Sequence, residues 1–109
     1  MIYTVHITEQ AENDLRGIYE YIAFGKKSPE NAGNQINRLE ESINALINFP
    51  EKHRPYDKEP WFSRGTRVMP VDNYVVYYIP NETTGIINVI RVLYSGQDRD
   101  THLSNTTVE

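Results

Sequence analysis

The spacing of hydrophobic residues changes along the chain, and each spacing predicts a different element. Near the start, Tyr3, Val5 and Ile7 alternate with polar residues, which is typical of a strand over residues 2–7. Apolar residues then recur every three or four positions, which predicts amphipathic helices over 9–24 and from 29 to 49. The two apolar stripes contain Ala11, Leu15, Ile18, Tyr19 and Ile22, and Ala32, Ile36, Leu39, Ile43, Leu46 and Ile47.

The ends of both helices carry sequence signals. Thr8 is an N-cap residue for the first helix, and Gly25 fits its C-terminal end. Ser28 is a second N-cap residue, because Pro29 follows it at the first helical position. Pro50 ends the second helix. Only residues 25–28 separate the two predicted helices, and a connection this short predicts an antiparallel helical hairpin.

Three further strands are predicted after a long loop over residues 50–65. They cover residues 66–71, 74–79 and 86–94, and short turns join them as an antiparallel meander. The order β–α–α–β–β–β predicts an α+β fold, with the helical hairpin packed on a mainly antiparallel four-stranded sheet. The first strand has to reach this sheet by crossing over through the helix pair. We expect one domain over residues 1–99 and a polar, partly loose tail over 100–109.

Composition narrows the classes of function. The 109 residues contain no cysteine, which excludes disulfides and a cysteine nucleophile, and the histidines lack metal-ligand spacing, so no metal or cofactor is expected. No apolar run approaches the roughly 20 residues that span a bilayer, and no leader is seen, so we expect a cytoplasmic protein without a membrane partner. The net charge of −4 disfavours a general nucleic-acid binder. One segment is nonetheless basic: Lys52, Arg54, Lys58, Arg64 and Arg67 lie within 52–69.

Several short segments, in this order and spacing, resemble the RelE/ParE toxin superfamily over about residues 1–99. They are Ala11–Leu15 with Ile18–Ile22, Ser28–Ala32, Leu46–Pro50, Gly65–Val68, Asp72–Tyr78 and Ile90–Tyr94. The chain is similar to the ParE-like branch, which includes the plasmid stabilisation toxins. The resemblance implies that the chain is the toxin of a bacterial type II toxin–antitoxin system. A cognate antitoxin would neutralise it, and the two proteins could form a hetero-oligomer.

The resemblance leaves the target open between two branches. ParE-like members inhibit DNA gyrase by binding, whereas RelE-like members cut mRNA on the ribosome. Because the chain is acidic, we favour gyrase binding without catalysis by this chain, and a metal-independent mRNA endonuclease is the alternative. A non-toxic antitoxin-binding module is a second alternative.

The resemblance also suggests the site residues. Arg67 and Arg91 fall at positions that bind phosphate in RelE-like nucleases, and His102 would complete a catalytic set if the chain were a nuclease. The predicted target-binding residues are Arg67, Arg91, Tyr94, Asp98 and Arg99, and the predicted antitoxin-binding residues are Tyr19, Ile22, Leu39, Ile43 and Trp61. The competing interpretation makes Arg67 and Arg91 sheet arginines paired with carboxylates, and Trp61 an anchor of the loop on the core.

Overall fold

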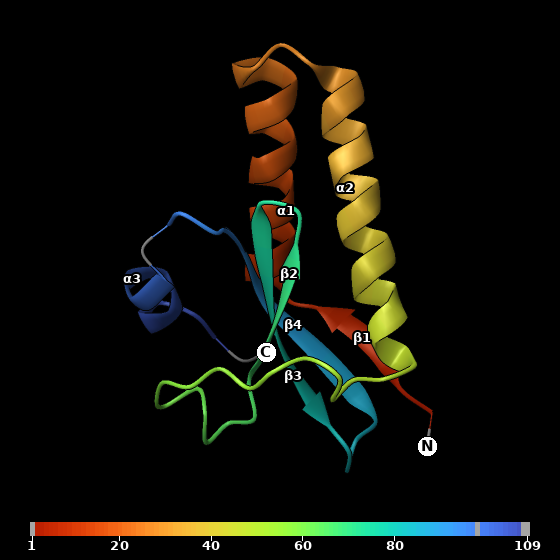
Figure 1. The fold of residues 1–109 in the computed structure, drawn as a ribbon, viewed down its shortest axis with the longest axis vertical. Coiled ribbons are helices and arrows are strands. Elements are labelled where there is room, and N and C mark those ends of the chain that lie inside the picture. The colour runs from red at the N-terminus through yellow and green to blue at the C-terminus, as the bar shows by residue number, and fades with distance from the viewer. Residues whose placement is uncertain (1, 98, 108–109) are drawn as a thin grey trace.

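The chain forms one strand, a helical hairpin and three further strands, followed by a short helix (Figure 1). The computed structural model describes residues 2–97 and 99–107. The elements are β1 (Thr4–Ile7), α1 (Glu9–Glu20), α2 (Pro29–Asn44), β2 (Arg67–Val71), β3 (Tyr74–Asn81), β4 (Ile86–Tyr94) and α3 (Arg99–Ser104). The predicted α+β fold and its element order are confirmed. Among the described residues, no helix has the length and apolar character needed to cross a membrane.

The strands form a mixed four-stranded sheet in the order β1-β4-β3-β2. The strands β2, β3 and β4 pair antiparallel as the predicted meander, whereas β1 lies parallel to β4 with Val5 opposite Ile87. The chain therefore crosses over through α1 and α2 between these two strands, as the sequence predicts. This crossover places α1 directly against β4.

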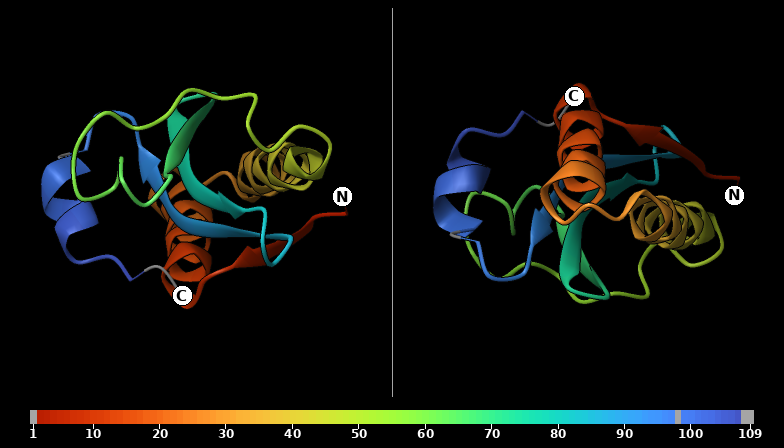
Figure 2. Two further views of the ribbon diagram at one scale, coloured as in Figure 1. Left: turned by 90° about the horizontal axis from the view of Figure 1, so that it is seen from below. Right: turned by 90° about the horizontal axis from the view of Figure 1, so that it is seen from above.

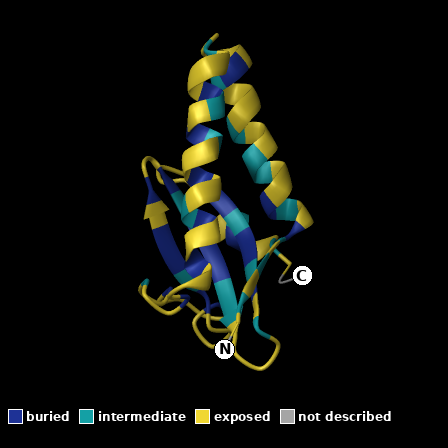
Figure 3. Ribbon diagram, turned by 90° about the vertical axis from the view of Figure 1, so that its right-hand side faces the viewer, coloured by how far each residue is buried: buried dark blue, intermediate teal, exposed yellow. Residues whose placement is uncertain are grey.

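The two faces of the sheet are covered by different parts of the chain. The hairpin covers one face, and its core, called here the helix-side core, includes Leu39, Ile43, Val76, Tyr78 and Val89. Figure 3 shows that the outer surfaces of both helices are exposed. The other face carries the loop-side core, which consists of Tyr56, Trp61, Val68, Tyr77, Ile90, Leu93 and Leu103. Figure 2 shows the loop after α2 and the helix α3 on the side of the sheet away from α2.

Two neighbouring tyrosines of β3 pack in different cores because side chains alternate along a strand, and they lie opposite a β-bulge in β4. Tyr77 lies opposite Arg91 and Tyr78 lies opposite Val89, so the register shifts by one residue at this point. The extra residue, Ile90, packs in the loop-side core with Tyr77. Both tyrosines are completely buried, on opposite faces of β3. No pattern in the sequence indicates the bulge.

The predicted cap of α1 is confirmed, and that of α2 is not. The Thr8 hydroxyl accepts a hydrogen bond from the Ala11 amide at 3.2 Å and donates one to the Ile90 carbonyl at 3.3 Å. Ser28 precedes α2 but makes no side-chain capping bond, so Pro29 and the first-turn Glu30 mark this start instead. α1 also ends at Glu20, earlier than predicted, in a π-helical turn over Tyr21–Gly25.

The segment predicted as a loose tail is packed on the fold as far as residue 107. It contains α3, whose Leu103 is buried in the loop-side core. The Gln10 side chain donates to the Asn105 carbonyl at 2.8 Å and accepts from the Thr107 amide at 2.7 Å. One leucine and a few polar contacts are enough to order this segment, and composition alone does not show them.

Candidate functional site

Arg67 holds the long loop against β2. Its Nη1 donates to the carbonyl oxygens of Glu51 at 3.1 Å and of His53 at 2.6 Å. These carbonyls lie in the loop that follows α2, so the guanidinium satisfies backbone groups that no strand pairs. The structure thus gives Arg67 a role inside the fold.

Arg91 is the centre of a polar cluster that joins β4, α1 and the C-terminal segment. Its Nε and Nη2 donate to the Asp14 carboxylate at 2.7 and 2.9 Å, and its Nη1 donates to the His102 carbonyl at 2.9 Å. The side chains of Arg91 and Asp14 are only 12% and 15% exposed. Such a two-pronged, largely buried pair leaves little donor capacity for an external phosphate. Asp14 also accepts from the Val92 amide at 2.9 Å, so it fixes the backbone of β4 as well.

The candidate nuclease residues do not gather at one point. Arg67 lies opposite Tyr78 and Arg91 lies opposite Tyr77, and these tyrosines face opposite sides of the sheet. His102 is close to Arg91 through its backbone, while its ring Nε2 lies 3.3 Å from the Gln97 amide nitrogen. The structure therefore brings Arg91 and His102 together and leaves Arg67 elsewhere. The interpretation of Arg91 as a sheet arginine paired with a carboxylate agrees with its contacts to Asp14, whereas Arg67 is held within the fold by carbonyl oxygens instead of a carboxylate.

The other predicted target-binding residues are more accessible. Tyr94 is 51% exposed at the end of β4, where its ring packs edge-on against Tyr74. Arg99 is exposed at the start of α3. Asp98 lies outside the described residues. Tyr94 and Arg99 thus remain available for a partner, whereas Arg67 and Arg91 are engaged.

The predicted antitoxin-binding residues divide in the same way. Tyr19 is 38% exposed and Ile22 is half-buried on the hairpin. Leu39 and Ile43 are completely buried against the sheet, because the apolar stripe of α2 faces the helix-side core. Trp61 is also buried, with the Arg64 guanidinium 4.6 Å from its ring centroid, so the anchor interpretation of this residue holds. The free chain therefore does not offer these three side chains to a partner.

A groove of about 760 Å³ runs between the exposed side of α1 and the ends of β3 and β4. Its apolar lining is Ile18, Tyr21, Ile22, Tyr74, Val92, Leu93 and Tyr94. Its polar lining includes Asp14, Arg91 and His102. Of the predicted residues, Ile22, Arg91, Tyr94 and His102 line this groove. Its mixture of apolar and polar side chains suits an amphipathic segment.

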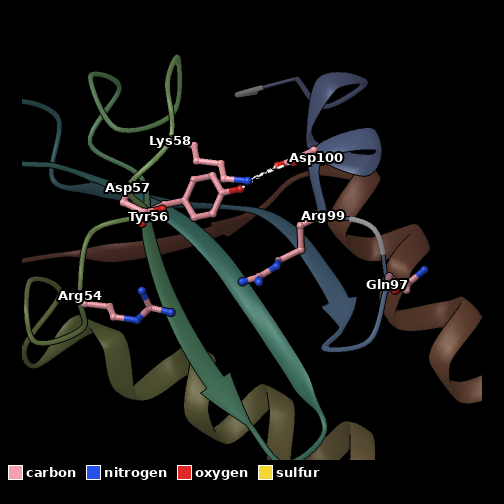
Figure 4. A pocket seen from close by; sticks show the side chains of 7 residues that line it. All are labelled: Arg54, Tyr56, Asp57, Lys58, Gln97, Arg99 and Asp100. Carbon is pink, nitrogen blue, oxygen red and sulfur yellow. Dashed lines mark hydrogen bonds and ion pairs between the residues drawn. The ribbon is translucent and has the colours of Figure 1, made fainter.

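A second hollow, of about 450 Å³, lies on the loop side of the sheet and is called here the arginine hollow (Figure 4). Its lining residues are Arg54, Tyr56, Asp57, Lys58, Gln97, Arg99 and Asp100. Lys58 forms an ion pair with Asp100 at 3.1 Å, and the Tyr56 hydroxyl lies 3.4 Å from the same carboxylate. The hydrogen bond that Lys58 donates to the Asp100 carboxylate raises the pKa of Lys58 above its ordinary value.

The sequence gives part of the signal for this hollow. Arg54 and Lys58 belong to the basic segment over residues 52–69, and Arg99 is a predicted target-binding residue. These residues line one hollow because the loop and α3 pack on the same face of the sheet. The two segments lie more than 30 residues apart in the chain, so their proximity cannot be read from the sequence. Tyr56 and Asp100 carry no recognisable motif, so sequence reasoning misses them.

Comparisons with a family model and with solved structures both point to toxins of type II toxin–antitoxin systems. A family model described as the ParE toxin of the type II toxin–antitoxin system parDE matches residues 5–99. Two similar solved structures are a chromosomal ParDE system from P. aeruginosa and the RelBE2 toxin–antitoxin complex from Mycobacterium tuberculosis. The first has a TM-score of 0.67 at 18% identity and covers 85% of this chain and 96% of its own. The second has a TM-score of 0.63 at 20% identity and covers 86% and 99%. No curated protein sequence matches significantly.

Proposed function

The chain belongs to the ParE toxin family of type II toxin–antitoxin systems, and from this premise we propose that it binds and inhibits DNA gyrase until a cognate antitoxin neutralises it. The proposed action is binding, with no bond made or broken by this chain. The observation that carries this choice is the engagement of Arg67 and Arg91 within the fold. A metal-independent ribonuclease needs an unpaired cation to stabilise the negative charge on the phosphate in the transition state. These two arginines instead donate hydrogen bonds to carbonyl and carboxylate oxygens of the protein.

The proposed target surface is the exposed end of β4 together with α3. Tyr94 offers an exposed aromatic ring and Arg99 an exposed guanidinium, the residue types that dominate binding energy in many interfaces. The proposed antitoxin site is the groove beside α1, where an amphipathic helix would place its apolar face on Ile22 and its neighbours. Arg91 supports both surfaces, because it fixes the C-terminal segment to β4 and α1.

The first experiment expresses the chain from a controlled promoter in bacteria that lack the antitoxin. Plasmid supercoiling and the 5′ ends of an abundant mRNA are measured in the same culture. We expect altered supercoiling or gyrase-linked DNA breaks while the mRNA stays intact. Growth without any change in DNA or mRNA would contradict a toxin function.

A supercoiling assay with purified gyrase tests the proposed surface directly. Tyr94→Ala and Arg99→Gln should each weaken inhibition by about tenfold or more, since exposed aromatic and arginine contacts of this kind are worth roughly 1–2 kcal/mol or more. Phe49→Ala is the matched control, because Phe49 is also exposed but lies in the loop after α2. Equal inhibition by all of these variants would remove the target surface from this end of β4.

The antitoxin site has its own test. Ile22→Asp places a charge in the apolar groove, so co-expression of the antitoxin, sought as the product of a short adjacent reading frame, should no longer protect the cell. Toxicity of the variant without antitoxin should be unchanged. Full protection by the antitoxin would place its binding site elsewhere.

The mRNA endonuclease remains the second candidate because of one observation. The arginine hollow presents Arg54, Lys58 and Arg99 on one face, which is a local cationic site on an acidic chain. Discrete mRNA cuts with normal DNA, in the expression experiment above, would favour this candidate over gyrase inhibition.

A further inference from the structure

The arginine hollow contains two guanidinium groups that pair with no carboxylate among the described residues. Figure 4 shows the side chains of Arg54 and Arg99 pointing into the same hollow from opposite sides, one from the loop and one from α3. The Arg99 guanidinium lies beside the Tyr77 hydroxyl, to which it donates. The remaining arginines, Arg16, Arg38, Arg64, Arg67 and Arg91, each contact a side chain, a carbonyl or a ring.

A buried hydroxyl beside the hollow has no acceptor for its proton among the described residues. The Tyr77 side chain is completely buried and packs edge-on against Tyr56, with ring centroids 5.7 Å apart. The Arg99 guanidinium lies beside this hydroxyl but can only donate to it. Burial raises the pKa of the hydroxyl, while the hydrogen bond from Arg99 and the charges of Arg99 and Arg54 lower it. An unsatisfied buried donor of this kind calls for an explanation, and a bound acceptor supplies one.

The charge of the lining residues selects the kind of anion. Arg54, Lys58 and Arg99 contribute three positive charges, and Asp57 and Asp100 contribute two negative ones, which leaves a net charge of +1. This balance matches a single carboxylate. A nucleic-acid strand would bring a charge at every phosphate toward Asp57 and Asp100, on a molecule whose net charge is −4.

We propose that the arginine hollow binds a carboxylate side chain from an acidic segment of a partner protein, held between Arg54 and Arg99 above the Tyr77 hydroxyl. Arginine suits this role because its planar fork donates two parallel hydrogen bonds to a carboxylate. The ion pair between Lys58 and Asp100 forms one wall of the site. This site goes beyond the proposed function, because it does not depend on gyrase being the target.

Titration of the purified full chain with an acetylated, amidated hexaglutamate peptide tests the site. The arginine side-chain Nε–Hε signals of the ¹⁵N-labelled protein report which guanidinium groups bind. We expect saturable shifts at Arg54 and Arg99, and we expect Arg54→Gln and Arg99→Gln each to weaken binding by about tenfold. Arg16→Gln removes the same charge from α1, outside the hollow, and should change the affinity less than about twofold, in line with its exposed position.

Two comparisons make the result decisive. A hexaglutamine peptide should cause no shifts, and a single-stranded hexathymidylate should bind more weakly than hexaglutamate. Tighter binding of the oligonucleotide through the same two arginines would overturn the carboxylate assignment. Equal weakening by Arg16→Gln would overturn the site, because it would mean that hexaglutamate senses only the overall charge.

The role of the Tyr77 hydroxyl is tested by removing it, because its loss should weaken binding without lowering stability. Tyr77→Phe removes a buried hydroxyl whose proton has no acceptor among the described residues and keeps the ring, so the melting temperature should stay the same or rise. Hexaglutamate affinity should nonetheless fall severalfold. Unchanged affinity would overturn the part of the site assigned to Tyr77, and a lower melting temperature would mean that the hydroxyl serves the fold.

Discussion

At the scale of single residues, the same side-chain type has different physical roles in different places. Arg91 is largely buried and makes paired hydrogen bonds to Asp14, whereas Arg38 pairs with Asp72 in an exposed position. Arg54 and Arg99 form no ion pair in the described residues. Burial and geometry, rather than the presence of an opposite charge, decide how much each arginine contributes to stability.

We predict very different costs for breaking the buried and the exposed ion pair. Asp14→Ala leaves the Arg91 guanidinium and the Val92 amide without their acceptor, so it should lower the free energy of unfolding by about 3 kcal/mol. Arg38→Ala should lower it by less than about 1 kcal/mol, because that pair is in contact with water. Urea unfolding measures both. Similar losses for the two variants would contradict the structural role of Arg91.

Tyr78→Phe is predicted to have an effect that depends on pH. The Tyr78 hydroxyl donates to the Pro50 carbonyl at 2.8 Å, so its loss should cost about 1–2 kcal/mol at neutral pH. Burial raises the pKa of Tyr78 to about 12, above its ordinary value of 10.0. The tyrosine therefore stabilises the fold fully below pH 10, and this stability is lost as the pH rises toward 12. The difference between the two proteins should shrink over that range, as followed by urea unfolding at several pH values.

At the scale of elements, the hydrophobic periods predict the meander to within two residues and the first residue of both hairpin helices, but α1 and α2 end four and five residues earlier than predicted. The predicted strand over 86–94 coincides with β4, and the Thr8 cap places the start of α1. Two features carry no local sequence pattern. They are the β-bulge opposite Tyr77 and the helix α3, which is held by Leu103 in the loop-side core.

Two glycines test the turns and helices separately. Gly85 joins β3 and β4 with a φ of +71°, and a Cβ there would lie 2.9 Å from the Ile2 carbonyl oxygen. Gly85→Ala should therefore destabilise the protein by about 2 kcal/mol. Gly33 lies inside α2 with open space around it, so Gly33→Ala should stabilise the protein by about 0.5–1 kcal/mol. Thermal unfolding distinguishes the signs, and a loss of stability in Gly33→Ala would contradict the open environment.

At the scale of the whole molecule, one sheet serves two cores. β3 contributes Tyr78 to the helix-side core and Tyr77 to the loop-side core, so neither core can form without this strand. The candidate site also depends on how the elements pack on the sheet.

The basic segment and the resemblance predict several of the cationic residues of the site. Only the packing of the loop and α3 on one face shows that Arg54 and Arg99 line the same hollow. Likewise, only the structure shows that Arg67 and Arg91 form hydrogen bonds elsewhere within the fold.

We predict that both cores unfold in one transition. Trp61 is the only tryptophan and lies in the loop-side core, so its fluorescence reports that face, whereas far-ultraviolet circular dichroism is dominated by the hairpin on the other face. The two urea curves should coincide within error. A tryptophan transition at clearly lower urea would mean that the loop and α3 unfold separately from the sheet.

The parallel pairing of β1 with β4 has a consequence for the newly made chain. Val5 and its partner Ile87 are separated by almost the whole fold, as are Thr8 and Ile90, whose contact spans 82 residues. At roughly 5–20 residues per second, synthesis of that stretch takes about 4–16 s. Throughout this interval β1 has no neighbouring strand and Asp14 has no Arg91. The growing polypeptide therefore acquires its complete sheet only as its last strand emerges, which gives an antitoxin made at the same time an opportunity to bind before the toxin is finished.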